Sequence, residues 1–343
     1  MRLGVLACSR DNNFNLIRFL AAAAVVLFHC YALTGHWTDE PLWRLAPELN
    51  LESLGVGSFF VVSGFLVTKS WIERGRLVPF AAARVLRIYP ALVCATLVTV
   101  ALAAWSSSYP LAAFVAAPET LDYAWRTATA FAVRDRLPGA FAGNPFPDSV
   151  NGSLWTLPVE LRLYVAVGAA GVTGLLTRRR VLTIAVAGLA VLYTMKPEWS
   201  PLAQFGPVTR VLALLFALGS LACAWRDRIL LSPAAALAAV AVVAWNPAGL
   251  GRGLLFPPLL AYALLVAAYH PRLVWPRFNR YGDCSYGLYV YAFPIQQTLV
   301  RLLPGIEPLA LFALAFPATL AVAMLSWRLV EKPALGLKSS SSH

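Results

Sequence analysis

The feature that most constrains this chain is the recurrence of apolar stretches long enough to cross a lipid bilayer. A membrane-spanning helix needs about 20 mostly apolar residues, because each residue advances the helix by about 1.5 Å across a core of about 30 Å. Ten such stretches can be drawn, and they cover 15–34, 52–70, 90–106, 153–176, 181–194, 208–224, 229–245, 254–269, 283–302 and 309–327. The pattern predicts an all-α fold, a polytopic bundle of about ten transmembrane helices.

The composition also favours a membrane protein over a soluble one. Of the 343 residues, 59% are hydrophobic and 13% are charged, whereas soluble domains average about 45–50% apolar and about 25% charged residues. We therefore expect a single membrane domain over 1–338, followed by a tag-like tail over 339–343. The five cysteines show no spacing typical of metal or redox sites, and no metal cofactor is predicted.

The positions of the basic residues predict the orientation of the chain. A net charge of +12 could indicate a nucleic-acid partner, but basic residues that gather in alternate gaps are typical of membrane orientation. With a cytosolic N-terminus, 18 of the 28 Lys and Arg residues lie on the cytosolic side, 6 lie outside and 4 lie within segments. This asymmetry predicts that both termini are cytosolic, and it argues against nucleic-acid binding.

Three ionisable residues inside the predicted segments are candidate functional residues, because charge within a membrane is costly. Arg18 and His29 are eleven positions apart, which places them on one face of a helix and about 16 Å apart along its axis. An imidazole can act as a general base near neutral pH, and a guanidinium suits an anionic ligand. Glu160 is the third residue, in a segment that runs the opposite way.

His29 and Glu160 are predicted to lie at similar depth. Counted from the segment ends, His29 lies about 21 Å from the cytosolic end and Glu160 about 10 Å from the outer end. A carboxylate beside an imidazole orients the ring and supports its role as a base, so a His29–Glu160 pair could activate a hydroxyl group. Structural roles stay open: His29 could bond a backbone carbonyl, Arg18 could extend to the interface, and Glu160 could join a polar cluster with Arg162 and Tyr164.

Two further stretches stand out. Gly57 and Gly64 are seven positions apart, with Ser63 close by, and small residues on one helix face let helices approach closely, so we favour a packing role for this stretch. The basic pair Arg84 and Arg87 follows in a cytosolic gap. Such a pair at a helix entrance could bind phosphate groups or could only enforce orientation.

Six motifs, taken in order along the chain, resemble the acyltransferase family 3 membrane proteins. They are Arg18-x10-His29, FFVVSGFL (59–66), RVLRIYP (84–90), SLWTLPVELRLY (153–164), SYGLYVYAFPI (285–295) and WRLVEKP (327–333). The resemblance spans nearly the whole chain. It implies a multi-pass protein of the bacterial inner membrane that takes cytosolic acyl-CoA, usually acetyl-CoA, as co-substrate. It further implies O-acylation of an extracytoplasmic carbohydrate, such as an O-antigen or exopolysaccharide, with a small molecule such as a macrolide as the alternative acceptor.

The same resemblance implies roles for individual residues. His29 would be the catalytic base, Arg18 its partner on the donor path, and Glu160 the acidic residue of the LW-x4-E motif. The implied donor-binding residues are Arg84, Arg87, Arg18, Ser63 and Tyr164. The chain departs from many relatives in having Ala292 where they have histidine, and no soluble esterase-like domain is expected after the bundle.

Alternatives remain at the level of the sequence. Direct attack of an acceptor hydroxyl on the thioester is favoured over a two-step route through an acyl-histidine. A proton-coupled transporter of a sugar or lipid precursor, with His29 and Glu160 as a proton relay, is the competing class. The sequence shows no internal repeat and no paired broken segments, which disfavours a transporter. Acceptor, acyl chain length and oligomeric state stay open, and a homo-oligomer is allowed.

Overall fold

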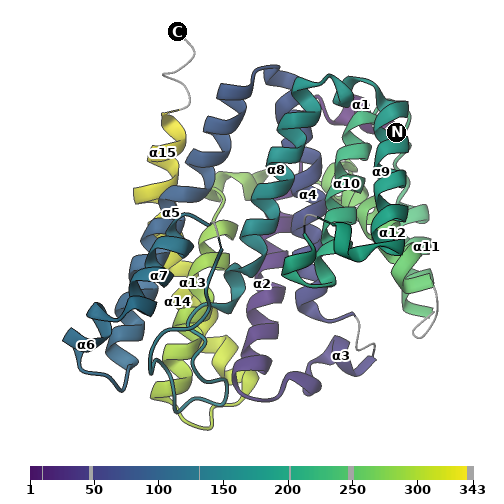
Figure 1. Cartoon of the computed structure of the whole chain (residues 1–343). Coiled ribbons are helices and arrows are strands. Elements are labelled where there is room, and N and C mark those ends of the chain that lie inside the picture. Colours follow the sequence, from purple (N-terminus) through teal and green to yellow (C-terminus); the bar gives the residue numbers. More distant parts are fainter. Residues whose placement is uncertain (10, 46–48, 131, 201, 246–250, 338–343) are drawn as a thin grey trace. The chain divides into compact units, whose positions relative to one another are not determined.

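The chain is mostly helical in the part that the computed structural model describes, which is residues 1–9, 11–45, 49–130, 132–200, 202–245 and 251–337 (Figure 1). No strand occurs in these ranges, so the all-α prediction is confirmed. The predicted tail at 339–343 lies outside them. Each predicted apolar segment overlaps a helix, and these helices are α2 (Phe14–Leu33), α4 (Leu51–Arg74), α5 (Leu77–Ser106), α8 (Leu157–Val172), α9 (Arg179–Met195), α10 (Val208–Ala224), α11 (Pro233–Trp245), α12 (Gly251–Tyr269), α13 (Ser285–Leu302) and α14 (Pro308–Ser326).

Four helices in the described ranges are long and apolar enough to cross a membrane. They are α2, α4, α5 and the continuous stretch Pro308–Gly336, which joins α14 to a π-helical turn (Trp327–Glu331) and to α15 (Lys332–Gly336). Their exposed side chains include large apolar ones, as at Leu97 in α5 and Leu325 in α14, which suits contact with lipid. The chain is a membrane protein, while the count of ten spans and the cytosolic termini stay predictions.

The start of α5 corrects the predicted segment at 90–106. The helix begins at Leu77, so Arg84 and Arg87 lie inside it rather than in a gap before it. Residues 80–88 are alanine, arginine, leucine and other residues compatible with a helix, and they continue the helix through Pro90. The predicted segment is shorter than α5 because the first turns of the helix carry two arginines.

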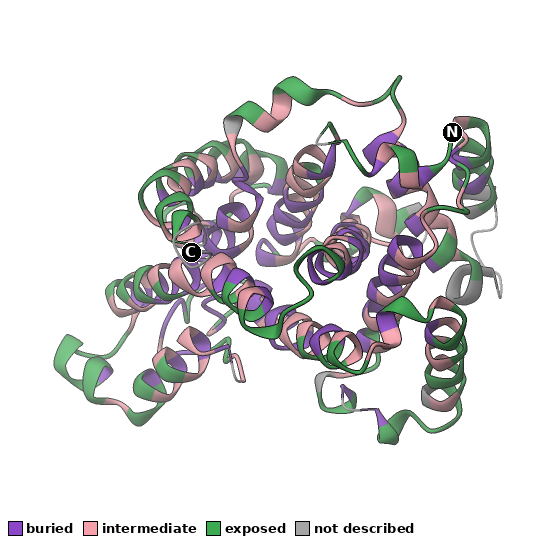
Figure 2. Cartoon of the chain, turned by 90° about the horizontal axis from the view of Figure 1, so that it is seen from above, coloured by how far each residue is buried: buried purple, intermediate pink, exposed green. Residues whose placement is uncertain are grey.

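Two compact units make up the chain, and unit 1 comprises Met1–Ala21, Leu54–Phe80 and Val159–Gly282. Its core is built around three rings, in which Phe14 of α2 packs on Phe65 of α4 and on Tyr269 of α12, with centroids 5.7 and 5.2 Å away. Many helices of the chain show buried residues along one side and exposed residues along the other (Figure 2). That pattern is typical of helices that pack on one another and face lipid or water outward.

Glycines bring α4 and α10 into backbone contact within unit 1. A Cβ atom on Gly64 would lie 2.0 Å from the carbonyl oxygen of Phe216, and one on Gly219 would lie 2.2 Å from that of Val61. At Gly57 the nearest atom would be a side-chain carbon of Leu215, at 3.0 Å. The predicted close packing along this face is therefore confirmed, and it is tightest at Gly64.

Unit 2 comprises Ala22–Ser53, Ala81–Pro158 and the chain from Asp283 onward. It contains α13 and α14, which pack side by side (Figure 1) and approach closely at Gly287, where a Cβ atom would lie 2.7 Å from that of Ala323. Phe293 and Leu311 belong to the apolar core between these helices and α2. The short helices α6 (Leu111–Ala116) and α7 (Pro118–Ala128) also belong to this unit.

Amide side chains tie the long segment between α5 and α8 to α13. Gln297 Nε2 donates hydrogen bonds to the carbonyl oxygens of Phe146 and Ser149, at 2.8 and 2.7 Å. Asn144 Nδ2 donates to Gln297 Oε1 at 2.7 Å, and Asn151 Nδ2 donates to the carbonyl oxygen of Val290 at 2.9 Å. These bonds give the irregular backbone of this segment buried hydrogen-bond partners.

The α4–α10 contact predicts the effect of a single methyl group. Gly64→Ala is expected to destabilise the protein by about 1–3 kcal/mol, because the new Cβ atom forces two backbones apart. Gly188→Ala, in α9, is the matched control, since its Cβ atom would meet nothing within 4 Å. Thermal unfolding of both variants in detergent micelles is the measurement, and equal midpoints for the two would contradict the predicted contact.

Candidate functional site

Glu160 lies in a cluster of hydroxyl groups within unit 1, which we call the carboxylate cluster. Ser63 of α4 donates a hydrogen bond from Oγ to Glu160 Oε1 at 2.7 Å, and Tyr164 donates one from its hydroxyl to the same oxygen at 2.5 Å. The two hydroxyl oxygens are 3.1 Å apart. Glu160 and Tyr164 share a face of α8 because they are one helical turn apart.

The structure thus brings together three of the predicted site residues. All three side chains are half-buried, and the two hydroxyl donors hold the carboxylate in one orientation. Both hydrogen bonds end on Oε1, and within the described residues Oε2 of Glu160 accepts none. Glu160 therefore keeps one oxygen that can accept a hydrogen bond from another group.

His29 lies on α2 within unit 2 and is 6% exposed. Its Nδ1 atom is 3.5 Å from Ser153 Oγ, and its ring packs edge to face on Phe293 with centroids 5.2 Å apart. Ser153 belongs to a 3-10 helix (Gly152–Thr156) that precedes α8. Among the described residues the other ring nitrogen, Nε2, makes no hydrogen bond, and it can accept a proton in the tautomer in which Nδ1 donates to Ser153.

Tyr289 of α13 positions the turn that carries Ser153. Its hydroxyl donates a hydrogen bond to the backbone oxygen of Ser153 at 2.7 Å and lies 2.9 Å from Thr156 Oγ1. Phe293, one turn further along α13, packs against Gly152, where a Cβ atom would lie 3.0 Å from the ring. Ser153, Tyr289 and Phe293 are not among the predicted site residues, although all three lie in motifs that carry the family resemblance.

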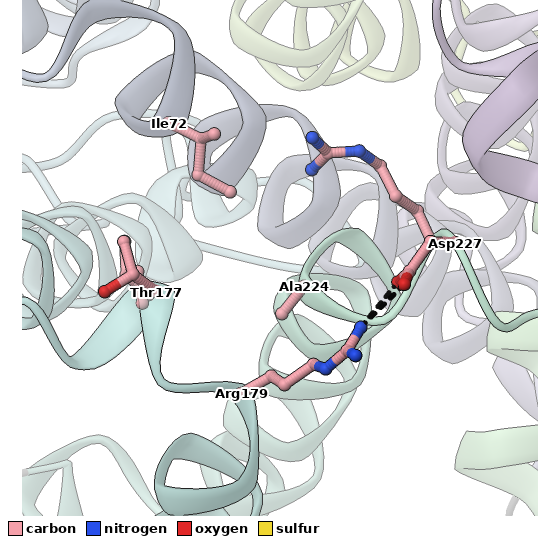
Figure 3. A pocket seen from close by; sticks show the side chains of 7 residues that line it. Ile72, Thr177, Arg179, Ala224 and Asp227 are labelled. Atoms are coloured by element: carbon pink, nitrogen blue, oxygen red, sulfur yellow. Dashed lines mark hydrogen bonds and ion pairs between the residues drawn. The ribbon is translucent and has the colours of Figure 1, made fainter.

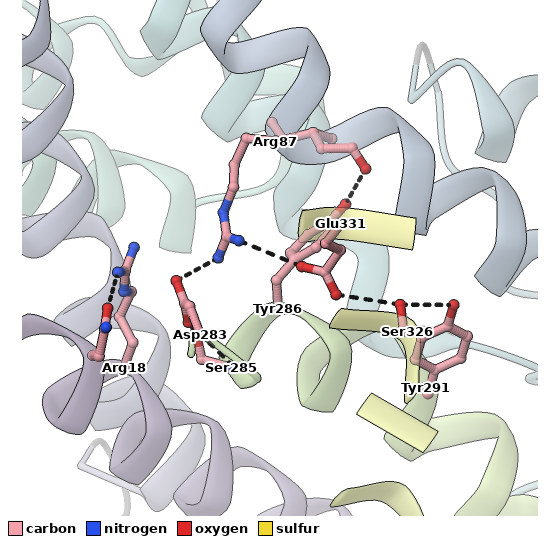
Figure 4. Close-up of polar contacts among 10 residues, drawn as sticks. Arg18, Arg87, Asp283, Ser285, Tyr286, Tyr291, Ser326 and Glu331 are labelled. Atoms are coloured by element: carbon pink, nitrogen blue, oxygen red, sulfur yellow. Dashed lines mark hydrogen bonds and ion pairs between the residues drawn. The ribbon is translucent and has the colours of Figure 1, made fainter. Parts of the chain in front are cut away.

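Arg87 forms a charged cluster with two carboxylates in unit 2 (Figure 4). Its Nη2 donates to Asp283 Oδ2 at 2.6 Å, and its Nη1 donates to Glu331 Oε2 at 3.4 Å. The guanidinium carbon also lies 5.6 Å from the ring centre of Tyr286 and 5.9 Å from that of Trp327. Glu331 is 1% exposed, so this is a buried ion-pair cluster in which two carboxylates share one guanidinium.

The Arg87 cluster bears on the predicted phosphate contact. Asp283 precedes α13, and Glu331 lies in the π-helical turn after α14, within the WRLVEKP motif. Phosphate at Arg87 would have to compete with two hydrogen-bonded carboxylates. Arg84 is half-buried one turn earlier on α5, and phosphate binding at Arg84 and Arg87 stays a prediction.

Arg18 lies on the same continuous helix as His29, as predicted. Its Nη2 donates to Asn15 Oδ1 at 2.7 Å, three residues earlier (Figure 4). Arg18 and Glu160 belong to unit 1 and His29 belongs to unit 2. The predicted His29–Glu160 pair therefore joins residues of different units, and it stays a prediction.

Unit 1 also contains a pocket of about 450 Å³, which we call the basic pocket (Figure 3). None of the predicted site residues lines it, and its lining residues are Ile72, Leu176, Thr177, Arg179, Ala224, Arg226 and Asp227. In the described part of the chain no group of three His, Cys, Asp or Glu side chains is placed to hold a metal ion.

Comparison with known proteins yields one family and two curated relatives. The family model described as an acyltransferase domain matches residues 11–328. An O-acetyl transferase of Shigella phage Sf6 is 28% identical over 334 residues, which cover 94% of this chain and 96% of the relative. Nodulation protein 10 of Rhizobium leguminosarum bv. viciae is 29% identical over 369 residues, which cover 96% of this chain and 94% of the relative. No solved structure matches the chain significantly.

The buried Arg87 cluster predicts a stability effect that is independent of any ligand. Arg87→Met is expected to destabilise the ligand-free protein by about 3–5 kcal/mol, because it removes the guanidinium to which the buried carboxylates of Asp283 and Glu331 are bonded. The matched control is the triple variant Arg87→Met, Asp283→Asn, Glu331→Gln, which removes all three charges and should recover much of the loss. Unfolding in detergent measures both, and an unchanged midpoint for Arg87→Met alone would contradict the structural role.

Proposed function

The chain belongs to acyltransferase family 3, and on that premise we propose that it transfers an acetyl group from cytosolic acetyl-CoA to a hydroxyl group of an extracytoplasmic carbohydrate. The observation that carries the proposal is the family match over residues 11–328. Similarity over nearly the full chain to a protein named O-acetyl transferase supports acetyl as the group transferred and oxygen as the acceptor atom. A multi-pass location in the bacterial inner membrane, with both termini cytosolic, accords with the long apolar helices and the distribution of basic residues.

In the proposed reaction, the acceptor hydroxyl oxygen attacks the carbonyl carbon of the thioester. His29 Nε2 accepts the hydroxyl proton as the new carbon–oxygen bond forms. The carbon–sulfur bond then breaks, and the departing sulfur takes the proton back from the imidazolium. Ser153 near Nδ1 and the edge-to-face contact with Phe293 support this role, because together they limit rotation of the imidazole.

Glu160 is proposed to stabilise the imidazolium that forms during the attack. The support is its fixed orientation: Ser63 and Tyr164 occupy one carboxylate oxygen, and the other is left to accept a hydrogen bond. The estimated depths of His29 and Glu160 in the membrane are also alike. A carboxylate in this position orients the ring and stabilises its charged form.

Membership in an acyltransferase family favours group transfer over the proton-coupled transporter. The acceptor is the least constrained part of the proposal, and carbohydrate is chosen because the family resemblance implies it. Acylation of a small molecule is the alternative acceptor. Mass spectrometry of surface glycans from cells with and without the protein distinguishes them, since only a carbohydrate acceptor predicts acetylated sugars that disappear with the gene.

Replacement of His29 tests the proposed base. His29→Ala is expected to lower acetyl transfer by about 10²–10⁴-fold, the usual contribution of a positioned base, while the folded protein stays in the membrane. His36→Ala is the matched control, because His36 lies after α2, in contact with Thr34. Transfer of labelled acetyl groups from acetyl-CoA in inverted vesicles is the measurement. Near-normal transfer by a folded His29→Ala variant would end the proposed mechanism.

Replacement of Glu160 tests the proposed stabilisation of charge. Glu160→Gln keeps the shape and can still bond Ser63 and Tyr164, so it should lower kcat by about tenfold or more with little change in KM for acetyl-CoA. Glu119→Gln, on the exposed first turn of α7, is the control. A rise in KM at constant kcat would instead assign Glu160 to donor binding.

A further inference from the structure

We propose that the basic pocket binds the phosphate groups at the nucleotide end of the acyl-CoA donor, so that the pantetheine arm extends along α4 and α8 to the carboxylate cluster. This inference rests on the proposed function and adds a donor site that the sequence did not indicate. It differs from the predicted contact at Arg84 and Arg87, because Arg87 is already paired with Asp283 and Glu331.

The pocket lies where three helix ends meet. Ile72 is in the last turn of α4, Thr177 ends a 3-10 turn (Leu175–Thr177) after α8, and Arg179 is the first residue of α9. The end of α10 at Ala224 and the turn that follows it complete the lining. Figure 3 shows the labelled side chains around a common hollow.

Arg179 is held in place by its neighbours. Its Nη1 donates to both carboxylate oxygens of Asp227, at 2.8 and 2.7 Å, and its guanidinium carbon lies 4.6 Å from the ring centre of Trp225. The hydrogen bond from Arg179 holds the pKa of the Asp227 carboxyl below its usual range, so the pair stays charged at neutral pH. Within the described residues, Nη2 and Nε of Arg179 make no hydrogen bond, and a phosphate could accept from them.

Arg226 gives the pocket its excess of positive charge. Its Nη1 donates to the backbone oxygen of Cys223 at 3.1 Å, and no carboxylate pairs with it in the described part of the chain. The lining therefore contains two guanidinium groups and one carboxylate. No side chain caps the N-terminus of the 17-residue helix α9 at this point, and the positive end of its dipole adds to the attraction for an anion.

The remaining lining residues suit the rest of a nucleotide. Ile72, Leu176 and Ala224 are apolar and offer surface to a purine ring, while the Thr177 hydroxyl can exchange hydrogen bonds with a ribose or phosphate. A volume of about 450 Å³ lies within the usual range of small-molecule sites, about 300–1,000 Å³. Five of the lining residues lie in predicted cytosolic gaps, and Leu176 and Ala224 are the last residues of the predicted segments before two of these gaps. The donor is proposed to enter from this side.

The packing of α4 on α8 gives the distance between the carboxylate cluster and the basic pocket. Ser63 of α4 bonds Glu160 of α8, and Trp71 packs on Gly171, where a Cβ atom would lie 1.9 Å from the indole ring. The contacts advance in the same direction along both helices, so α4 and α8 run parallel here. Nine residues separate Ser63 from Ile72, which corresponds to about 14 Å along the helix axis.

The pantetheine arm matches that length. Thirteen bonds join its phosphorus atom to its sulfur atom, and an extended chain advances about 3.5 Å per three bonds, so the arm spans about 15 Å. With phosphate in the basic pocket, the thioester would lie level with the carboxylate cluster. The length of the pantetheine arm therefore matches the separation between Ser63 and Ile72 along α4. This match is the observation that favours the basic pocket as a donor site.

The experiment compares two donors on the same protein sample. Acetyl-CoA carries the nucleotide, and S-acetylpantetheine lacks it. Arg179→Gln together with Arg226→Gln should lower kcat/KM for acetyl-CoA by about tenfold to a hundredfold, as expected for lost phosphate contacts, and leave S-acetylpantetheine unchanged. Arg180→Gln is the matched control, because Arg180 is exposed and does not line the pocket. Calorimetric binding of CoA itself should weaken by the same factor in the double variant.

The outcomes separate this inference from the proposed function. Wild-type protein that consumes neither thioester would refute the proposed function, whereas unchanged donor preference and CoA affinity in an active double variant would refute the pocket alone. An anionic lipid headgroup offers similar phosphate chemistry, so the assay is repeated in phosphatidylcholine vesicles with and without phosphatidylglycerol. A lipid-dependent activity that disappears in the double variant, with donor preference intact, would assign the pocket to lipid and overturn the donor site.

Discussion

The cost of an ionised side chain among apolar helices governs the arrangement of this protein. A helix in lipid satisfies its own backbone hydrogen bonds, so the side-chain charges are the groups that must find partners. Glu160 accepts hydrogen bonds from two hydroxyl groups. Arg87 forms ion pairs with two carboxylates and lies near two aromatic rings. Both sets of contacts join residues of different helices, so these polar groups also fix how those helices pack.

In unit 2, side chains of α13 form many of the buried hydrogen bonds that join different segments. Gln296 donates to the backbone oxygen of Val26 and to the Cys30 sulfur beside His29, at 2.7 and 2.9 Å. Gln297 bonds to the long segment between α5 and α8, and Tyr289 with Phe293 positions the turn that carries Ser153. A motif that reads as aromatic and apolar in the sequence therefore sets the surroundings of the proposed base.

The sequence predicted helices better than it predicted partners. The segment at 208–224 has the bounds of α10, because a mostly apolar run lies between Gly206-Pro207 and the charged residues at 226–228. The segment at 90–106 was too short, since helix formation does not require apolar residues, and α5 continues through Arg84 and Arg87. The helical spacing of Glu160 and Tyr164 was evident, but their shared contact with Ser63 depends on how α4 and α8 are aligned.

The sequence by itself determined the helical class, the membrane character and the family, because these depend on local apolar runs and on motifs in a fixed order. Only the tertiary structure decided that Arg87 pairs with Asp283 and Glu331, nearly 200 and more than 240 residues away, and that Arg179 and Arg226 share a pocket. Hydrophobic periodicity shows which face of a helix is buried, but it carries no information on which helix covers that face. The packing of the whole chain decides which helices are neighbours, and the side-chain partners follow from that packing.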